Sequence, residues 1–348
     1  TTEIYTLSLH DALPICYRTA LVGKWHLGFA PHFGPLRSGY ERFFGPMSGG
    51  VDYFSHLDYG GNLDLWDGDQ PCAMPGRYLT DLITERAVDC IGSYGADTPF
   101  LLSVHYTAPH WPWEAREDEA ESRRIGHRVV HLDGGSIATY RRMVQQMDEG
   151  IGRIVQALTS AGRLDDTLLV FTSDNGGERF SDNWPFVGQK MDLLEGGIRV
   201  PLIAHWPAGI APGRTATPAI SMDWMPTLLS VAGVSSDPAF LPDGIDLTPL
   251  FSDAAWRPER ALYWRMLHRQ QRALRRGSWK YLHVDGHDYL FDLARDERER
   301  ANQAQREPER LAAMRQDWER WAATMLAIPE DARVAHVYSE RDMPRPTH

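Results

Sequence analysis

Cysteine, long apolar runs and basic charge are all scarce in this sequence. Its three cysteines, Cys16, Cys72 and Cys90, show no C-x-x-C spacing and so predict neither a disulfide framework nor a thiolate zinc site. No run of about 18 apolar residues occurs, and the first residues lack the order of a signal peptide. Lys and Arg total 36 against 47 Asp and Glu, a net charge of -11 that opposes a broad grip on nucleic acid. We expect neither a membrane nor a nucleic-acid partner.

Residues 1–15 differ in character from the rest of the chain. They show no clean helical or strand period and run into a proline, which breaks either element. The stretch also resembles a translated sequencing adapter, so we treat it as a non-native segment and exclude it from the expected fold.

Buried strands alternate with amphipathic helices over residues 16–250. Short apolar runs at 99–106, 167–172 and 200–206 predict strands. Apolar spacings of three and four predict helices from 78, over 137–158, where Gly162 would end the helix, and after Asp223 as N-cap. This order predicts an α/β domain, with a mostly parallel sheet sandwiched by helices.

The pattern changes over residues 251–348. ALYWRML, WKYLHV and HDYLFDL are short alternating runs separated by turn residues, and apolar spacing over 307–325 predicts one more helix. We expect a small C-terminal antiparallel sheet plus helix, with the domain boundary between residues 246 and 260.

Lys24 and His26 stand between glycines in GKWHLG. In an extended backbone, side chains two residues apart face the same side, so the pair suits an anion. A surface hairpin with incidental polarity is the equally weighted alternative.

Asp174 and Asn175 directly follow the predicted strand 167–172. Loops at the carboxyl ends of parallel strands bind ligands, and two hard oxygen donors suit Ca²⁺ or Mg²⁺. The alternative is an ordinary turn, since Asp-Asn-Gly-Gly is strong turn chemistry.

His110 and Lys190 complete the candidate set. His110 lies between prolines just after the strand that ends at Tyr106, and Lys190 precedes the strand 200–206. Together the GKWHLG segment, His110, the Asp174–Asn175 turn and Lys190 predict a metal-assisted anion site. The absence of GxGxxG, P-loop, GxSxG and HExxH spacings argues against nucleotide-binding, α/β-hydrolase and zinc-protease functions.

GKWHLG, APHWP, TSDNGG and EGGIRVPLIAHWP resemble, in this order, motifs of the type I sulfatases of the alkaline phosphatase superfamily. LRRGSWKYLHV with YLFDLARDERERAN resembles the C-terminal subdomain of that family. The resemblance implies an alkaline phosphatase-like fold and hydrolysis of aryl or carbohydrate sulfate esters, small-molecule or saccharide. It also implies a periplasmic or secreted location.

The resemblance assigns a role to each candidate residue. Lys24 and His26 would contact the nucleophile and the sulfate, and His110 and Lys190 would hold sulfate oxygens or protonate the leaving group. Asp174 and Asn175 would ligate Ca²⁺. The residues Gln189 and Met191 depart from the small neighbours usual around that lysine.

Two family features are absent upstream of GKWHLG. These are a pair of adjacent aspartates for the metal and a C/S-x-P/A-x-R motif whose Cys or Ser becomes the formylglycine nucleophile. The string from Cys72 to Arg77 is one residue too long and lies downstream, so we treat it as coincidence. We expect an N-terminally truncated sulfatase, inactive as this chain alone. The alternatives are a phosphodiesterase or phosphonate hydrolase of the same superfamily, or a noncatalytic binder of sulfated sugars.

Overall fold

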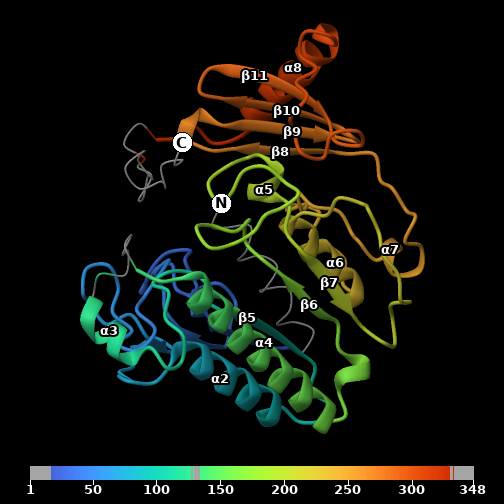
Figure 1. Cartoon of the computed structure of the whole chain (residues 1–348). Coiled ribbons are helices and arrows are strands. Elements are labelled where there is room, and N and C mark those ends of the chain that lie inside the picture. The colour runs from blue at the N-terminus through green and yellow to red at the C-terminus, as the bar shows by residue number, and fades with distance from the viewer. Residues whose placement is uncertain (1–16, 127, 129–133, 330–331, 333–348) are drawn as a thin grey trace. The chain divides into compact units, whose positions relative to one another are not determined.

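The computed structural model describes residues 17–126, 128, 134–329 and 332, which form two compact units (Figure 1). Of the described residues, the first unit holds those up to 169 and residues 205–256, and the second holds residues 170–204, 257–329 and 332. The predicted non-native segment of residues 1–15 lies outside the described residues.

A five-stranded sheet organises the first unit, in the order β4-β3-β2-β1-β5. Strand β1 pairs in parallel with β2 and with β5, while the short strands β3 and β4 add an antiparallel edge. The predicted α/β class is confirmed, with a sheet that is mixed because of this hairpin. The strands are β1 (Arg18–Gly23), β2 (Arg42–Gly45), β3 (Trp66–Asp67), β4 (Gln70–Pro71) and β5 (Phe100–His105).

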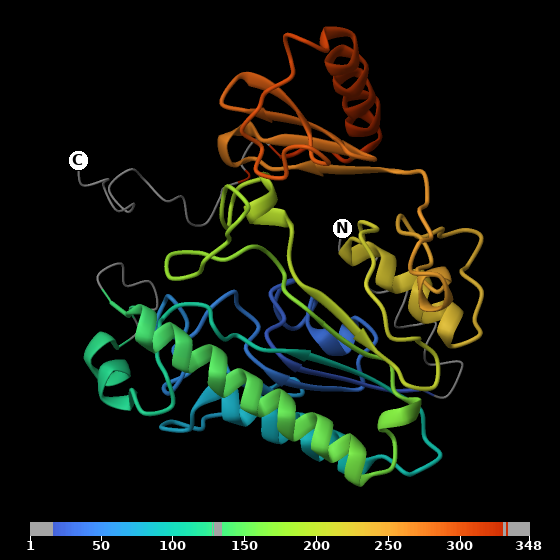
Figure 2. The ribbon, with the colours of Figure 1, turned by 45° about the vertical axis from the view of Figure 1, so that its right-hand side comes forward.

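Two long helices, α2 (Leu79–Ser93) and α4 (Ile137–Ser160), lie side by side against one face of this sheet (Figure 2). Ala87 and Ile91 of α2 form a buried cluster with Ile154 and Leu158 of α4, and side chains of β5 pack on it. Burial of these apolar faces fixes the helices on β5. The shorter helices of the unit are α3 (Glu119–Ile125), α6 (Trp224–Val231) and α7 (Pro249–Ser252), with single turns η2 (Pro35–Arg37), η3 (Leu164–Asp166) and η4 (Ser221–Asp223).

The buried face of α4 differs from the predicted face in its first half. Ile137 is 51% exposed and Val144 37% exposed, although both belong to the apolar spacing. Gln146 is buried there instead, because its side-chain oxygen accepts a hydrogen bond from Arg116 N and its amide donates to Glu117. Tertiary polar contacts therefore override periodicity, while the predicted end of the helix at Gly162 agrees with its φ of +66°.

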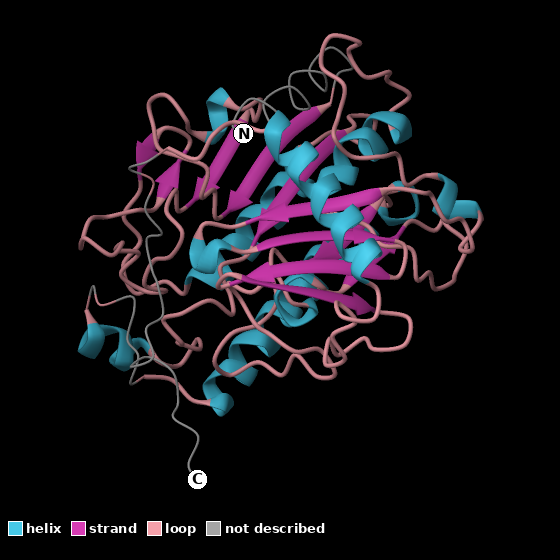
Figure 3. Ribbon diagram, turned by 90° about the horizontal axis from the view of Figure 1, so that it is seen from above, coloured by secondary structure: helices cyan, strands magenta, loops and turns pink. Residues whose placement is uncertain are grey.

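In the second unit a four-stranded antiparallel sheet, in the order β11-β10-β9-β8, carries α8 on one face (Figure 3). Because side chains alternate along strands, Leu274, Tyr281 and Leu290 face α8, whereas Ala273 and Leu282 face the opposite side. The predicted small C-terminal sheet plus helix is confirmed. The elements are β8 (Ala261–Arg265), η5 (His268–Gln270), β9 (Arg272–Arg276), β10 (Trp279–Val284), β11 (His287–Asp292) and α8 (Pro308–Thr324).

The remaining elements lie close, along the chain, to the residues at which the two units divide. Strands β6 (Leu169–Thr172) and β7 (Leu202–His205) pair with each other, and the one-turn helix α5 (Glu195–Ile198) precedes β7. None of the helices in the described residues has the length and apolar character of a membrane span.

Candidate active site

The GKWHLG segment leaves β1 and runs along the ends of its two neighbouring strands. The Lys24 amide donates to His105 O at 2.8 Å, and the His26 amide donates to Met47 O at 3.0 Å. Lys24 is half-buried and His26 is exposed. The expectation of an extended backbone is wrong at His26, whose φ is +57°, so its orientation comes from these backbone contacts and not from strand alternation.

Two consecutive glycines bring His26 and His110 to the same place. A Cβ at Gly49 would stand 2.4 Å from His26 Nε2, and a Cβ at Gly50 would stand 3.4 Å from His110 Cε1 and 2.8 Å from the Tyr59 hydroxyl. A side chain at Gly49 would displace the His26 imidazole, whereas one at Gly50 would displace the Tyr59 hydroxyl and touch the His110 ring at ordinary contact distance. The two histidines, 84 residues apart in numbering, therefore lie against adjacent backbone positions.

The loop that carries His110 is held by two buried tyrosines. The Tyr53 hydroxyl donates to His110 O at 2.9 Å, and the Tyr78 hydroxyl donates to Glu114 O at 2.9 Å. His110 Nδ1 lies 2.7 Å from Trp111 O, a contact that assigns the hydrogen to Nδ1 and makes Nε2 the nitrogen that exchanges a proton.

A buried carboxyl pair lies beneath this loop. Glu114 and Asp52 are both completely buried, and one Glu114 oxygen accepts from Tyr53 N at 3.2 Å. Burial, reinforced by the Asp52 charge, raises the pKa of Glu114 to about 10. Glu114 therefore stays protonated at neutral pH. Burial also lowers the pKa of the neighbouring His56 to about 4, so this ring stays neutral.

The Asp174–Asn175 turn and Lys190 are joined within the second unit. Lys190 N donates to Gly177 O at 3.0 Å, and Gly176 N donates to Gly197 O at 2.9 Å. A Cβ at Gly176 would stand 1.8 Å from Gly196 O, so the backbones are in direct contact and only glycine fits. The lysine and the turn thus form one constellation.

Charge is partly balanced around Lys190. Its Nζ lies 3.6 Å from a carboxylate oxygen of Glu178, and both side chains are largely shielded from solvent. Met191, one of the two larger neighbours of Lys190, has a left-handed backbone with a φ of +76°. The exposed Asp174 carboxylate makes no hydrogen bond or ion pair with the described residues.

Sequence patterns missed the supports of this site. The Ser48–Gly50 stretch follows the short strand β2, and Tyr53 and Tyr78 act through single hydrogen bonds. The sequence signal that could have found these supports is the pair Gly49-Gly50 after an apolar segment, because paired glycines mark a close approach of the backbone.

An α/β fold in which histidines and hard oxygen donors follow the strands is the arrangement expected of an anion-binding site. Residues 16–234 match the family model described as Sulfatase, and the chain belongs to the sulfatase family of the alkaline phosphatase superfamily.

Curated relatives agree with this membership. Arylsulfatase J of Mus musculus is 29% identical over 70% of this chain and 41% of its own length. N-acetylgalactosamine-6-sulfatase of Mus musculus is 31% identical over 67% of this chain and 46% of its own length. The chain thus spans less than half the length of these two relatives.

Solved structures share the fold. Ps i-CgsB in complex with k-i-k-neocarrahexaose superposes with a TM-score of 0.78 at 27% identity, over 92% of this chain and 75% of that chain. BT4656 in complex with its substrate D-glucosamine-2-N,6-O-disulfate has a TM-score of 0.66 at 21% identity, over 92% of this chain and 81% of that chain.

Proposed function

We propose that this chain is part of a sulfatase that hydrolyses sulfate esters of saccharides or aryl alcohols. The observation that carries the proposal is the placement of His26 and His110 against Gly49 and Gly50, in a chain of the sulfatase family. Two imidazoles at one strand-end loop provide both an anion contact and a proton donor.

The chemistry requires charge stabilisation and one proton transfer. Hydrolysis breaks the bond between sulfur and the alcohol oxygen, and the departing oxygen must gain a proton. We assign that proton to His110 Nε2, and we assign stabilisation of the sulfuryl oxygens to His26 and the ammonium group of Lys24, all in the first unit. For Lys190, in the second unit, the family resemblance implies a contact with sulfate oxygens. The sequence contains no C/S-x-P/A-x-R motif for the formylglycine nucleophile that the resemblance implies.

The Asp174–Asn175 turn fits a calcium ion in donor chemistry. Asp174 offers an exposed carboxylate, and Asn175 donates its Nδ2 to Gly176 O at 2.9 Å, which leaves its Oδ1 for a cation. These are two hard oxygen ligands out of the roughly six to eight that Ca²⁺ takes. Within the described residues, no cluster of three or more His, Cys, Asp or Glu side chains supplies the rest. When bound, Ca²⁺ would offset negative charge on the sulfate.

The saccharide substrate class is favoured by the neighbours' ligands. Two structures of similar fold are complexes with k-i-k-neocarrahexaose and with D-glucosamine-2-N,6-O-disulfate. The first is also 27% identical in sequence.

The test of this function compares the turnover of three substrate classes by one protein. A form extended by an upstream segment with paired aspartates and C-x-P-x-R is assayed on sulfate monoesters, phosphate diesters and phosphonates. We expect sulfate-ester turnover to exceed the others. Preferred turnover of phosphate diesters would establish the phosphodiesterase alternative, and sulfated-sugar binding without any turnover would establish a noncatalytic binder.

Asp174→Ala is expected to weaken Ca²⁺ binding by at least tenfold in the extended protein, because it removes a charged ligand from a small shell. Calorimetric titration measures the change. Asp182→Ala, at an exposed aspartate of the same unit, is the matched control and should leave the affinity unchanged. Equal Ca²⁺ affinities in the two variants would show that TSDNGG forms a turn and does not bind the metal.

A further inference from the structure

The sequence contains only three lysines, and one of them is completely buried. Lys280 on β10 has no exposed side-chain surface, and its Nζ lies 2.9 Å from Glu195 Oε1 and 2.8 Å from Glu299 Oε1. Arg275 Nη1 stands 3.6 Å from the other Glu195 oxygen. The more exposed Arg199 Nη1 lies 3.9 Å from the same Glu195 oxygen. Lys280 and Arg275 thus pair with two carboxylates inside the second unit, and we name Lys280, Arg275, Glu195 and Glu299 the buried quartet.

Burying such a group is costly unless every charge is paired. Each ion loses its hydration, and attraction within the interior repays that loss only when the geometry is tight. Apolar side chains would fill the same space with less constraint on position. The buried quartet therefore fixes the relative position of the segments that contribute its four residues.

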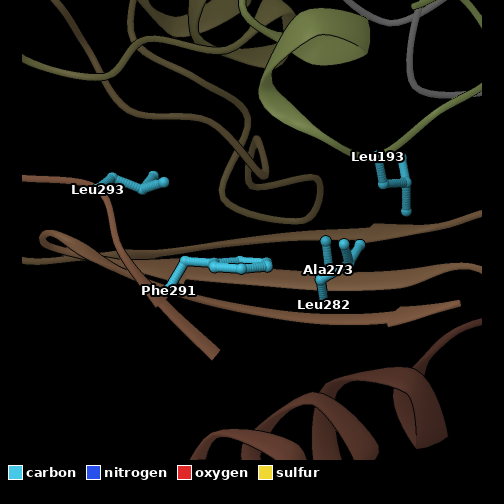
Figure 4. Packing of buried hydrophobic residues seen from close by; sticks show 5 residues of the cluster. All are labelled: Leu193, Ala273, Leu282, Phe291 and Leu293. Atoms are coloured by element: carbon cyan, nitrogen blue, oxygen red, sulfur yellow. The ribbon is translucent and has the colours of Figure 1, made fainter. Parts of the chain in front are cut away.

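The quartet fastens the segment before β7 to the C-terminal sheet. Glu195 N donates to Glu299 Oε2 at 2.6 Å, at the first residue of α5. Just upstream, Leu193 N donates to Gln271 Oε1 at 2.8 Å, and Gln271 Nε2 donates to Met191 O at 2.8 Å. Figure 4 shows Leu193 above the sheet face that carries Ala273, Leu282 and Phe291.

The same segment carries the candidate ligands. Gly196 N donates to Val187 O at 2.7 Å, which closes the loop that contains Lys190. Gly197 O accepts from Gly176 N, and Gly176 is in direct backbone contact with Gly196. A shift at Glu195 must therefore be transmitted to Lys190 and to the turn that precedes Gly176.

We propose that Glu195, Lys280 and Glu299 are positioning residues, which hold Lys190 and the Asp174–Asn175 turn in fixed register. Their part in ligand binding rests on the proposed function, whereas the positioning itself does not. The partners lie 85 and 104 residues from Glu195 along the chain, so the C-terminal sheet acts as a support for the site in the second unit.

Glu195→Gln tests the proposal, because it keeps the side-chain shape and removes one charge. In the whole 348-residue chain, selective ¹³C labelling of lysine gives three side-chain signals, each assigned by a Lys→Arg variant. Hydrogen exchange of the Gly176 and Lys190 amides is followed in parallel, and inorganic sulfate is titrated onto the Lys190 signal. We expect at least tenfold faster exchange at both amides, a shifted Lys190 signal and at least fivefold weaker sulfate binding.

Two controls separate positioning from general loss of stability. Leu290→Ala destabilises the same sheet from its α8 face and should leave the Lys190 signal and both amides unchanged well below its melting midpoint. The Lys24 signal, from the first unit, should not move in either variant. Arg275→Gln, at the more exposed rim of the quartet, should reproduce the effect more weakly and serves if Glu195→Gln does not fold.

Unchanged exchange at Gly176 and Lys190 in a folded quartet variant would overturn the proposal. So would an equal change in Leu290→Ala, which would make the effect one of stability. If the amides and the Lys190 signal respond but wild-type protein binds no sulfate, the positioning stands and the sulfate contact assigned to Lys190 fails.

Discussion

His110→Ala is expected to lower kcat/KM for an aryl sulfate by about 10²–10⁴-fold in the protein extended by the nucleophile segment. The reason is that His110 would supply the proton taken up by the leaving oxygen. The loss should shrink for esters of more acidic alcohols, which leave without protonation. Steady-state kinetics on a series of aryl sulfates with graded leaving-group pKa measures it.

His287→Ala is the matched control, since His287 is exposed on the β10–β11 hairpin. It should retain full turnover. A His110→Ala loss that is the same for every leaving group would instead assign His110 to binding of the sulfate oxygens. Full retention of turnover by His110→Ala would remove the residue from the site.

Glu114→Gln is expected to stabilise the protein increasingly as pH rises. The folded protein keeps the proton on Glu114 to about pH 10, whereas the unfolded chain releases it near the ordinary value of 4.5. Between these values the folded state binds one more proton, so rising pH lowers the free energy of unfolding by about 1.4 kcal/mol per pH unit through this group. Glutamine cannot ionise and still accepts from Tyr53 N, so the variant loses that slope.

Urea unfolding between pH 5 and 9 measures this prediction, with Glu85→Gln, at a partly exposed carboxylate of the same unit that pairs with Arg77, as control. The decline in the free energy of unfolding at acid pH should remain in both variants. His56 is neutral in the folded state down to about pH 4, so the unfolded chain binds a proton first as pH falls below about 6.5 and stability declines. A parallel alkaline slope in wild type and Glu114→Gln would show that Glu114 is already ionised.

Local patterns predicted the elements whose sequences hold an apolar run or an apolar periodic face. Helices α2, α4 and α8 and strands β5, β6 and β7 all have this signal, and each was expected within a few residues of its observed bounds. The predicted burial of β7 is wrong, since Leu202 is 43% and Ile203 57% exposed. The strands β1 and β2 escaped prediction. Glycine at their ends and charged first residues interrupt the apolar run, and their burial depends on pairing between strands far apart in sequence.

The candidate site was predictable in its residue types and not in its supports. His110, Asp174 and Asn175 follow predicted strands and Lys190 precedes one, whereas His26 was singled out by its pairing with Lys24 between glycines. The contact of His110 with Gly50 and the salt bridge between Glu195 and Lys280 are long-range pairings, which no local period encodes. Lys280 in particular looked like an ordinary strand residue, since lysine is normally solvated.

The burial of Lys280 leaves the folded chain with few side-chain amines for coupling chemistry. Active esters or reductive alkylation would reach only Lys24 and Lys190 without unfolding, and both are candidate ligand contacts. Immobilising the protein through lysine would therefore attach it by its own site and block it. The partly accessible thiol of Cys72 offers an anchor outside that site, while selective acylation of the two amines would give a chemical footprint of whatever ligand protects them.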